Sequence, residues 1–212
     1  MSTQQRRGVL VAFEGIDGAG KTTQVRLLEA RLAAADIPFV STKEPTTGPW
    51  GQKIRTSAQT GRMSPADELD AFVRDRREHV AGLIEPSLAA GKVVIVDRYY
   101  LSTVAYQGAR GLDPAHLLTL NSFAPPPDVL VILDVDPTLG LERIRQRGDR
   151  ADLFELEDEL TRARAIFRAL DLPGLHIFDG TRPIADLHAA ISAAVLAAWT
   201  ARPAGGAAAP RT

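Results

Sequence analysis

The sequence predicts an α/β protein, a three-layer domain in which a five-stranded parallel sheet is flanked by helices. Five short apolar runs separated by helix-periodic segments support this prediction, because parallel strands buried on both faces read as continuous apolar runs. The 212 residues, 45% of them hydrophobic, are enough for one such domain with a full core. The expected strands are Val9–Phe13, Ile37–Val40, Val93–Val96, Val129–Leu133 and Leu175–Phe178.

The first apolar run leads into a glycine-rich segment, Gly15–Thr22, which precedes a helix-periodic stretch. A strand, the pattern G-x-x-x-x-G-K-[ST] and a helix, in this order, are typical of a phosphate-binding loop. The glycines let backbone N–H groups turn toward a phosphate chain, and the helix presents its positive N-terminal end to the same anion. Lys21 would supply charge for the terminal phosphates and Thr22 a hydroxyl for Mg²⁺. The alternative, a purely structural turn, rarely combines these features.

Apolar runs are followed directly by a carboxylate at Glu14, Asp97 and Asp134. Ligands of doubly wound sheets bind at the carboxyl ends of strands, so Glu14 and Asp97 are candidate site residues, whereas Asp134 can begin the next turn. Asp97 is suited to hold Mg²⁺, directly or through water. Arg98 can grip a phosphate with two parallel hydrogen bonds. The alternative for these two residues is a solvated ion pair.

Several helix boundaries and the domain limits follow from the sequence. Asp113-Pro114 and Asp136-Pro137 each place a capping carboxylate before a proline at the first helical position. The last helix is expected from near Pro183 to about Trp199. We expect one domain over residues 8–200, a flexible N-terminus over 1–7, and a disordered tail, rich in Ala, Gly and Pro, over 201–212.

A long helix is expected from about Pro65 to Ala90, and Arg76 lies on its apolar stripe. A buried guanidinium is costly unless it is paired, so Arg76 beside Phe72 can form a cradle for a planar, hydrogen-bonding ligand. The equal alternative is that Arg76 extends to solvent and Phe72 belongs to the core. Pro86 is expected to kink the helix near its end. The charged neighbours are expected to form a solvated face; they are Arg74, Asp75, Arg77 and Glu78.

Two further segments are rich in polar side chains. Arg143, Arg147 and Arg150 would share one face of a continued helix, where like charges repel unless an anion binds between them. Residues 143–153 are therefore suited to form a lid, with a basic surface patch as the alternative. The segment Tyr99–Gly111 combines hydroxyls, an amide and glycines. It can read a sugar or base edge, or it can be an ordinary helix start.

The overall composition excludes several classes of protein. A net charge of −1 gives no reason to expect a nucleic-acid or membrane partner. The absence of cysteine excludes disulfides and thiolate metal sites. No signal peptide is visible, and no stretch is expected to span a bilayer. We therefore expect a soluble cytoplasmic protein that holds anionic ligands by local charge.

In this order the segments resemble the thymidylate kinase family, which belongs to the nucleoside monophosphate kinases. The resemblance covers about residues 8–200 and implies a three-layer P-loop kinase fold and a homodimer. It also implies that ATP and Mg²⁺ are used to phosphorylate dTMP to dTDP by direct in-line transfer. The matching pieces are Phe13–Gln24, Lys43–Pro45, Asp97–Tyr99, Ala105–Gly108 and Asp179–Pro183.

The resemblance further implies roles for individual residues. Phe72 would stack on thymine, Arg76 would bind its O4 edge, and Tyr106 would crowd the 2′ position. The implied ATP-binding residues are Gly15, Ile16, Asp17, Gly18, Ala19, Gly20, Lys21, Thr22 and Thr23. The implied dTMP-binding residues are Glu44, Pro45, Arg55, Phe72, Arg76, Arg98, Ser102, Thr103, Tyr106 and Gln107. The implied catalytic residues are Lys21, Asp17, Arg98, Arg147 and Arg150, and the implied metal ligands are Thr22 and Asp97.

Three departures from the family pattern and two alternatives remain. Leu101 stands where many members carry a polar or small residue, and Thr46–Gly51 is an unusual continuation of the segment after Pro45. The family usually has arginine where this chain has Lys43, which keeps the charge but loses the fork geometry. The first alternative is a related P-loop kinase with a different nucleotide or a deoxynucleoside as acceptor. The second is a GTP-binding switch, against which the absence of an Asn-Lys-x-Asp motif argues.

Overall fold

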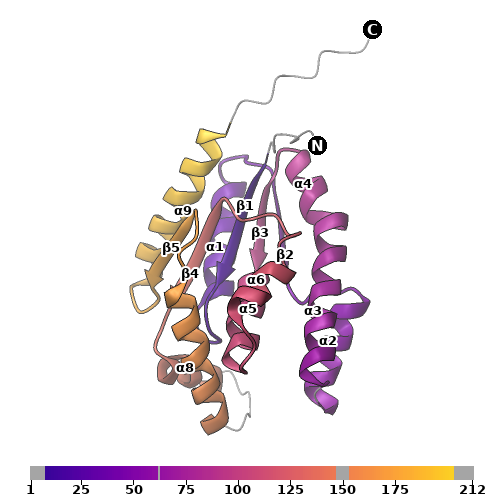
Figure 1. The fold of residues 1–212 in the computed structure, drawn as a ribbon. Coiled ribbons are helices and arrows are strands. Elements are labelled where there is room, and N and C mark those ends of the chain that lie inside the picture. The colour runs from indigo at the N-terminus through magenta and orange to yellow at the C-terminus, as the bar shows by residue number, and fades with distance from the viewer. Residues whose placement is uncertain (1–7, 62, 147–152, 203–212) are drawn as a thin grey trace.

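Five strands form one sheet in the computed structural model, which describes residues 8–61, 63–146 and 153–202 (Figure 1). The strand order is β2-β3-β1-β4-β5, and every neighbouring pair is parallel. The predicted α/β fold with a five-stranded parallel sheet is therefore confirmed. The strands are β1 (Val9–Glu14), β2 (Phe39–Lys43), β3 (Val93–Asp97), β4 (Val129–Asp134) and β5 (Leu175–Asp179).

Helices cover both faces of the sheet and make three layers. Helices α1 and α9 contact each other and the central strands on one face, whereas α4, α5 and α8 lie over the other (Figure 1). Right-handed crossovers between parallel strands require this division, because the chain reverses direction across the sheet after β2. The helices are α1 (Lys21–Ala33), α2 (Pro49–Thr60), α3 (Pro65–His79), η1 (Val80–Ile84), α4 (Glu85–Ala89), α5 (Tyr100–Ala109), α6 (Pro114–Leu120), α7 (Pro137–Gln146), α8 (Leu153–Ala169) and α9 (Ile184–Ala201).

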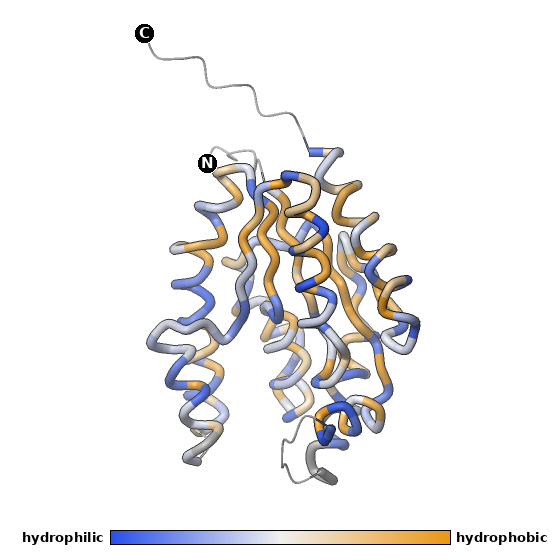
Figure 2. The backbone as a smooth tube through the Cα atoms, turned by 180° about the vertical axis from the view of Figure 1, so that it is seen from behind, coloured by the Kyte–Doolittle hydropathy of each residue, from blue (hydrophilic) through white to orange (hydrophobic). Residues whose placement is uncertain are grey.

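The core lies around the three central strands. The residues of β1 are all buried, and β3 and β4 are buried except at their last residue, which agrees with the hydrophobic colouring of the strands in Figure 2. The expectation that all five strands are buried is wrong for β2 and β5, since each has a neighbour on one side only. On β5, for example, Ile177 is 45% exposed. Composition alone does not say which apolar run forms an edge strand.

The predicted long helix over residues 65–90 consists of three pieces. Helix α3 is followed by a five-residue π-helical segment, η1, and then by α4, which contains Pro86. Proline has no N–H to donate, and its ring would clash with the carbonyl of the residue four positions earlier, here Gly82. The wider π turn directly before Pro86 accommodates both effects without ending the helix.

The capping predictions are confirmed at both aspartates. Asp113 accepts hydrogen bonds from the N–H groups of Ala115 and His116, and Asp136 accepts one from Thr138. The last helix extends to Ala201, two residues beyond the expected end. Residues 1–7 and 203–212 lie outside the described residues, as do residues 147–152 of the expected lid.

The expectation that no stretch is long and apolar enough to span a bilayer is wrong for α9. This helix has 18 residues and a mean hydropathy of 1.5, and 22% of it is buried inside the structure. Its buried residues include Leu187, Ile191 and Val195, and it packs on α1, β1 and β4. The apolar residues on the inner side of α9 are therefore explained by the packing of this helix on the sheet.

The glycine-rich loop contacts the first turns of α7 backbone to backbone. A Cβ atom added at Gly18 would lie 2.2 Å from the carbonyl oxygen of Gly140, and one added at Gly140 would lie 2.6 Å from that of Asp17. Both distances are too short for a side chain, so glycine is required on each side of the contact. The position of the loop is therefore tied to the helix that leads into the expected lid.

We expect Gly140→Ala to lower the free energy of unfolding by about 1–3 kcal/mol, because the added methyl group must displace backbone. Gly82→Ala is the matched control, since nothing lies within 4 Å of its added Cβ. Alanine there should raise stability by about 0.5–1 kcal/mol, the usual gain over glycine in a helix. Urea unfolding of both variants measures the difference, and a shift of equal sign and size would contradict the close contact.

Candidate active site

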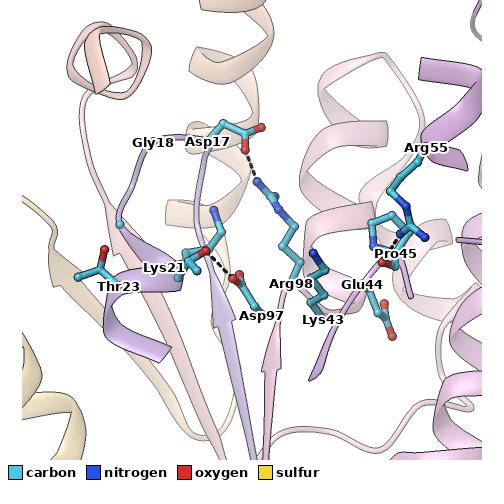
Figure 3. Close-up of a pocket in the computed structure, with 12 residues that line it drawn as sticks. Asp17, Gly18, Lys21, Thr23, Lys43, Glu44, Pro45, Arg55, Asp97 and Arg98 are labelled. Atoms are coloured by element: carbon cyan, nitrogen blue, oxygen red, sulfur yellow. Dashed lines mark hydrogen bonds and ion pairs between the residues drawn. The ribbon is translucent and has the colours of Figure 1, made fainter. Parts of the chain in front are cut away.

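A cavity of about 300 Å³ opens at the carboxyl ends of the central strands (Figure 3). Its lining comes from the glycine-rich loop and the start of α1, from the segment after β2, and from the end of β3. The register of the sheet places these segments at one level, because Asp97 pairs with both Phe13 and Lys43. The lining residues are Asp17, Gly18, Gly20, Lys21, Thr22, Thr23, Lys43, Glu44, Pro45, Arg55, Asp97 and Arg98.

Lys21 is folded back onto its own loop. Its Nζ donates to the carbonyl oxygens of Gly15 at 3.0 Å and Ile16 at 2.9 Å. Burial, together with the positive charge of Arg98, lowers the pKa of the Lys21 ammonium from 10.5 to about 8. The lysine is thus a cation held at the cavity by two neutral acceptors, which a phosphate group can replace at favourable energy.

Thr22 and Asp97 form a second polar pair beside the lysine. Thr22 Oγ1 donates to Asp97 Oδ2 at 2.8 Å, while Asp97 Oδ1 is buried and accepts no hydrogen bond from the described residues. A buried carboxylate oxygen without a donor is costly, and a divalent cation or its bound water would satisfy it. The residues present therefore fit Mg²⁺. Within the described ranges there is no cluster of three or more His, Cys, Asp or Glu suited to a metal.

Arg98 spans the cavity from the end of β3 to the glycine-rich loop. Its guanidinium forms an ion pair with Asp17 (Figure 3). It also lies 5.4 Å from the centre of the Tyr106 ring. Burial opposes the charge of Asp17, but Arg98 and Lys21 outweigh it and hold the pKa of that carboxyl below its usual range. Tyr106 fixes the loop as well, since its hydroxyl accepts from Asp17 N at 3.0 Å. The loop, the arginine and the tyrosine therefore form one connected unit.

Glu14, the last residue of β1, lies beneath this unit and caps the N-terminus of α5, the helix that follows β3. Its carboxylate accepts hydrogen bonds from the N–H groups of Tyr99 and Ser102 and from the Ser102 hydroxyl. These bonds replace a local cap, because the N-cap residue Tyr99 makes no side-chain capping bond. Complete burial raises the pKa of the Glu14 carboxyl from 4.5 to about 7. Glu14 was correctly placed near the site, but it supports the site from below and does not line the cavity.

The side of the cavity formed by the segment after β2 is built on a buried ion pair. Arg76 Nη2 lies 2.7 Å from Glu44 Oε2, and the two side chains are 1% and 3% exposed. Thr103 and Asn121 accept further hydrogen bonds from Arg76, and His79 Nδ1 lies 2.9 Å from Glu44 Oε1. The alternative that Arg76 extends to solvent is wrong. The guanidinium instead holds the segment that begins at Glu44, directly behind the cavity.

Several residues expected at dTMP do not line the cavity of the described structure. Phe72 is half-buried and is absent from the side chains that pack on the core. Ser102 donates to Glu14, and Thr103 accepts from Arg76. Gln107 donates to Glu68 through Nε2, while its buried Oε1 accepts no hydrogen bond from any residue that the structure describes. Of this group, Phe72 and Gln107 therefore keep groups that a ligand can engage.

The lid arginines separate into described and undescribed residues. Arg143 is described, and its two Nη atoms donate to the carbonyl oxygens of Gly18 and Gly180 at 3.2 and 3.4 Å. It therefore joins the glycine-rich loop to the turn after β5. Arg147 and Arg150 lie outside the described residues.

Some residues of the site were missed in the sequence. Asp75 was expected on a solvated face but is 2% exposed, whereas its neighbours Arg74, Arg77 and Glu78 are exposed as expected. His79 is also buried. Spacing was the available signal, because Asp75 and His79 follow the buried Ala71 by four and eight residues and so share its helix face.

Comparison with known proteins identifies the family of this chain. A model of the thymidylate kinase family matches residues 13–191. The chain belongs to the thymidylate kinase family. The resemblance inferred from the sequence motifs is thus confirmed.

Relatives named thymidylate kinase share more than half of the aligned residues with this member of the thymidylate kinase family. The protein of Xanthomonas campestris pv. campestris (strain B100) is 57% identical over 174 residues, which are 82% of this chain and 77% of that protein. The protein of Xanthomonas oryzae pv. oryzae (strain PXO99A) is 56% identical with the same coverage. The protein of Xylella fastidiosa (strain M12) is 54% identical over 82% of this chain and 80% of its own length.

We expect Arg76→Ala to lower the free energy of unfolding by about 3–5 kcal/mol, because it leaves Glu44 buried without its cation. Arg74→Ala is the matched control two positions earlier on the same helix. Its side chain is 54% exposed and pairs with Asp70, so its loss should cost about 1 kcal/mol or less. Urea denaturation measures both values, and equal effects would show that the buried pair is unimportant for stability.

We expect Glu14→Gln to change how stability depends on pH. The raised pKa means that the contribution of Glu14 to stability is fully present below pH 4.5 and is lost as the pH rises toward about 7. Glutamine does not titrate, and its amide can still accept from the two N–H groups and donate to Ser102. Between pH 4.5 and about 7, the free energy of unfolding of the variant should therefore rise relative to that of the wild type by about 3 kcal/mol. Denaturant unfolding from pH 4 to 8 measures the difference, and a constant difference would contradict the assignment.

Proposed function

We propose that this chain transfers the terminal phosphoryl group of ATP to dTMP, giving ADP and dTDP, with Mg²⁺ as cofactor. Membership of the thymidylate kinase family supports the reaction and the acceptor. The observation that carries the proposal is the single cavity wall in which the glycine-rich loop, the Thr22–Asp97 pair and Arg98 meet. Such a wall can hold the triphosphate chain of ATP and the single phosphate of dTMP end to end.

The donor side of the proposed reaction uses the glycine-rich loop. In this proposal residues 15–23 bind the phosphates of ATP, and Lys21 moves from the Gly15 and Ile16 carbonyls to the transferring phosphate. Thr22 and Asp97 hold Mg²⁺, for which the unpaired Asp97 Oδ1 is suited. The bound ion would neutralise charge on the donor phosphates during transfer.

The acceptor side uses the other half of the wall. Arg98 and Arg55 bind the phosphate of dTMP, and Glu44-Pro45 shape its site. Phe72 stacks on thymine and Gln107 offers its unpaired Oε1 to the base. Ser102, Thr103, Arg76 and Tyr106 act in this proposal as the polar wall behind the nucleoside. Asp17 orients Arg98, with which it is paired.

The proposed chemistry is an in-line displacement without a covalent intermediate. A phosphate oxygen of dTMP is ionised near neutral pH, so the reaction needs no general base. The protein contributes alignment and charge: Lys21, Arg98 and the lid arginines Arg147 and Arg150 stabilise the negative charge on the transferring group. We also propose that the protein is a homodimer and acts in the cytoplasm.

Purified protein with Mg²⁺, ATP and one acceptor at a time tests the proposal. We expect dTMP to give dTDP and one ADP per turnover, with a higher kcat/KM than dUMP, UMP or thymidine. Lys21→Met should lower kcat by about a hundredfold or more, because it removes the charge that the transition state requires. Lys53→Met removes an exposed lysine of α2 and is the matched control, with kcat near the wild type.

Two outcomes would contradict the proposal in different ways. No dTDP from dTMP under these conditions would exclude the reaction itself. A higher kcat/KM for thymidine than for dTMP would make the chain a deoxynucleoside kinase. Omission of Mg²⁺, with EDTA present, should abolish turnover for every acceptor.

A further inference from the structure

Asp75 of α3 is a buried carboxylate that binds one residue of the segment between β2 and α2. Its Oδ2 accepts from the backbone N of Thr46 at 2.7 Å, and its Oδ1 accepts from Thr46 Oγ1 at 2.6 Å. In the described part of the chain no ion pair involves Asp75, although its exposure is only 2%. Burying a carboxylate is costly unless hydrogen bonds satisfy it, so its place in the fold depends on Thr46.

Thr46 in turn sets where α2 begins. Its Oγ1 accepts from the N–H of Gly48, the N-cap residue of α2, at 3.0 Å. A Cβ atom added at Gly51 would lie only 1.9 Å from the carbonyl oxygen of Thr46, so the first turn of α2 packs directly on the Thr46 backbone. The start of this helix is thus held by one threonine, which is held by Asp75.

Helix α2 carries Arg55 into the cavity wall. The Arg55 Nη1 donates to the carbonyl oxygen of Pro45 at 2.9 Å, which ties the helix back to the same segment (Figure 3). Glu44, on the other side of Pro45, is held by Arg76 and His79 of α3. One face of α3 therefore binds residues 44 and 46, while Pro45 and Arg55 line the cavity.

We propose that Asp75 and Thr46 are positioning residues for the acceptor nucleotide, because they fix the start of α2 and thereby hold Arg55 at the cavity. Neither side chain lines the cavity. Their effect should therefore reach the acceptor through Arg55 and leave the donor side unchanged. The inference rests on the proposed function, since it takes Arg55 as a ligand of the dTMP phosphate.

Thr46→Val tests the proposal, because valine keeps the shape of threonine but removes its hydroxyl. We expect the KM for dTMP to rise about tenfold, as for a lost hydrogen bond to a charged group, and the KM for ATP to change less than twofold. Thr46→Ser keeps the hydroxyl and should restore the KM for dTMP to within about twofold of the wild type. Thr47→Val makes the same chemical change at the exposed neighbouring residue and should have no effect.

A double-mutant cycle with Arg55→Ala tests the route through the arginine. When Arg55 is absent, Thr46→Val should add little to the KM for dTMP, because both changes remove the same interaction. Thermal unfolding checks that every variant is folded. Asp75→Asn keeps the side-chain volume and provides a second test, in which the KM for dTMP should again rise and the KM for ATP should stay nearly unchanged.

The outcomes separate this inference from the proposed function. Failure of the wild-type chain to form dTDP in the same assay would overturn the proposed function. If the wild type is active, an unchanged KM for dTMP in Thr46→Val would overturn the positioning role. Equal rises in both KM values, or full additivity with Arg55→Ala, would overturn it as well.

Discussion

The site depends on the balance of charge around two cations, Lys21 and Arg98, which share one small cavity. Each cation makes the charged form of the other less favourable, and burial adds to this electrostatic cost, as the lowered pKa of Lys21 shows. Three carboxylates offset it: Asp17 pairs with Arg98, and Asp97 and Glu14 lie close enough to act on Lys21. A phosphate chain that binds here would meet Arg98 already in place and would require only that Lys21 leave the carbonyl oxygens of Gly15 and Ile16, so little reorganisation would be needed.

Much of the fold could be predicted because it rests on local patterns. Apolar runs predicted β1, β3, β4 and β5 closely, and Asp-Pro pairs marked the starts of α6 and α7. The expected run Ile37–Val40 shares only residues 39–40 with β2, which continues through the polar residues 41–43. The order of the strands is a different matter, since it depends on which crossovers bury the most surface. The run Leu175–Phe178 is apolar except for His176 and forms an exposed edge, whereas Val93–Val96 lies inside the sheet.

The candidate site also has a part that could be predicted from the sequence and a part that could not. The glycine-rich loop, Asp97 and Arg98 were predictable because each follows a strand directly, and a parallel sheet brings strand ends together. The support behind them was not, because it joins residues far apart in sequence. Arg76 meets Thr103 and Asn121, which lie 27 and 45 residues away, and no periodicity signals such a partner. Asp75 is a different case: its spacing from Ala71 placed it on the buried face of α3, but three exposed charged neighbours made it resemble a surface residue.

The π-helical segment η1 lets the buried faces of α3 and α4 point in different directions about the helix axis. A regular α-helix advances 100° per residue, so one extra residue in a turn rotates everything beyond it relative to everything before it. Upstream, the rotation leaves Asp75, Arg76 and His79 facing the nucleotide-binding end; downstream, it leaves Leu88 packed in the core beside β3. Deletion of a single residue between Val80 and Ile84 would therefore rotate α4 relative to α3. The chain could then keep the polar contacts of α3 or the core contact of Leu88, but not both.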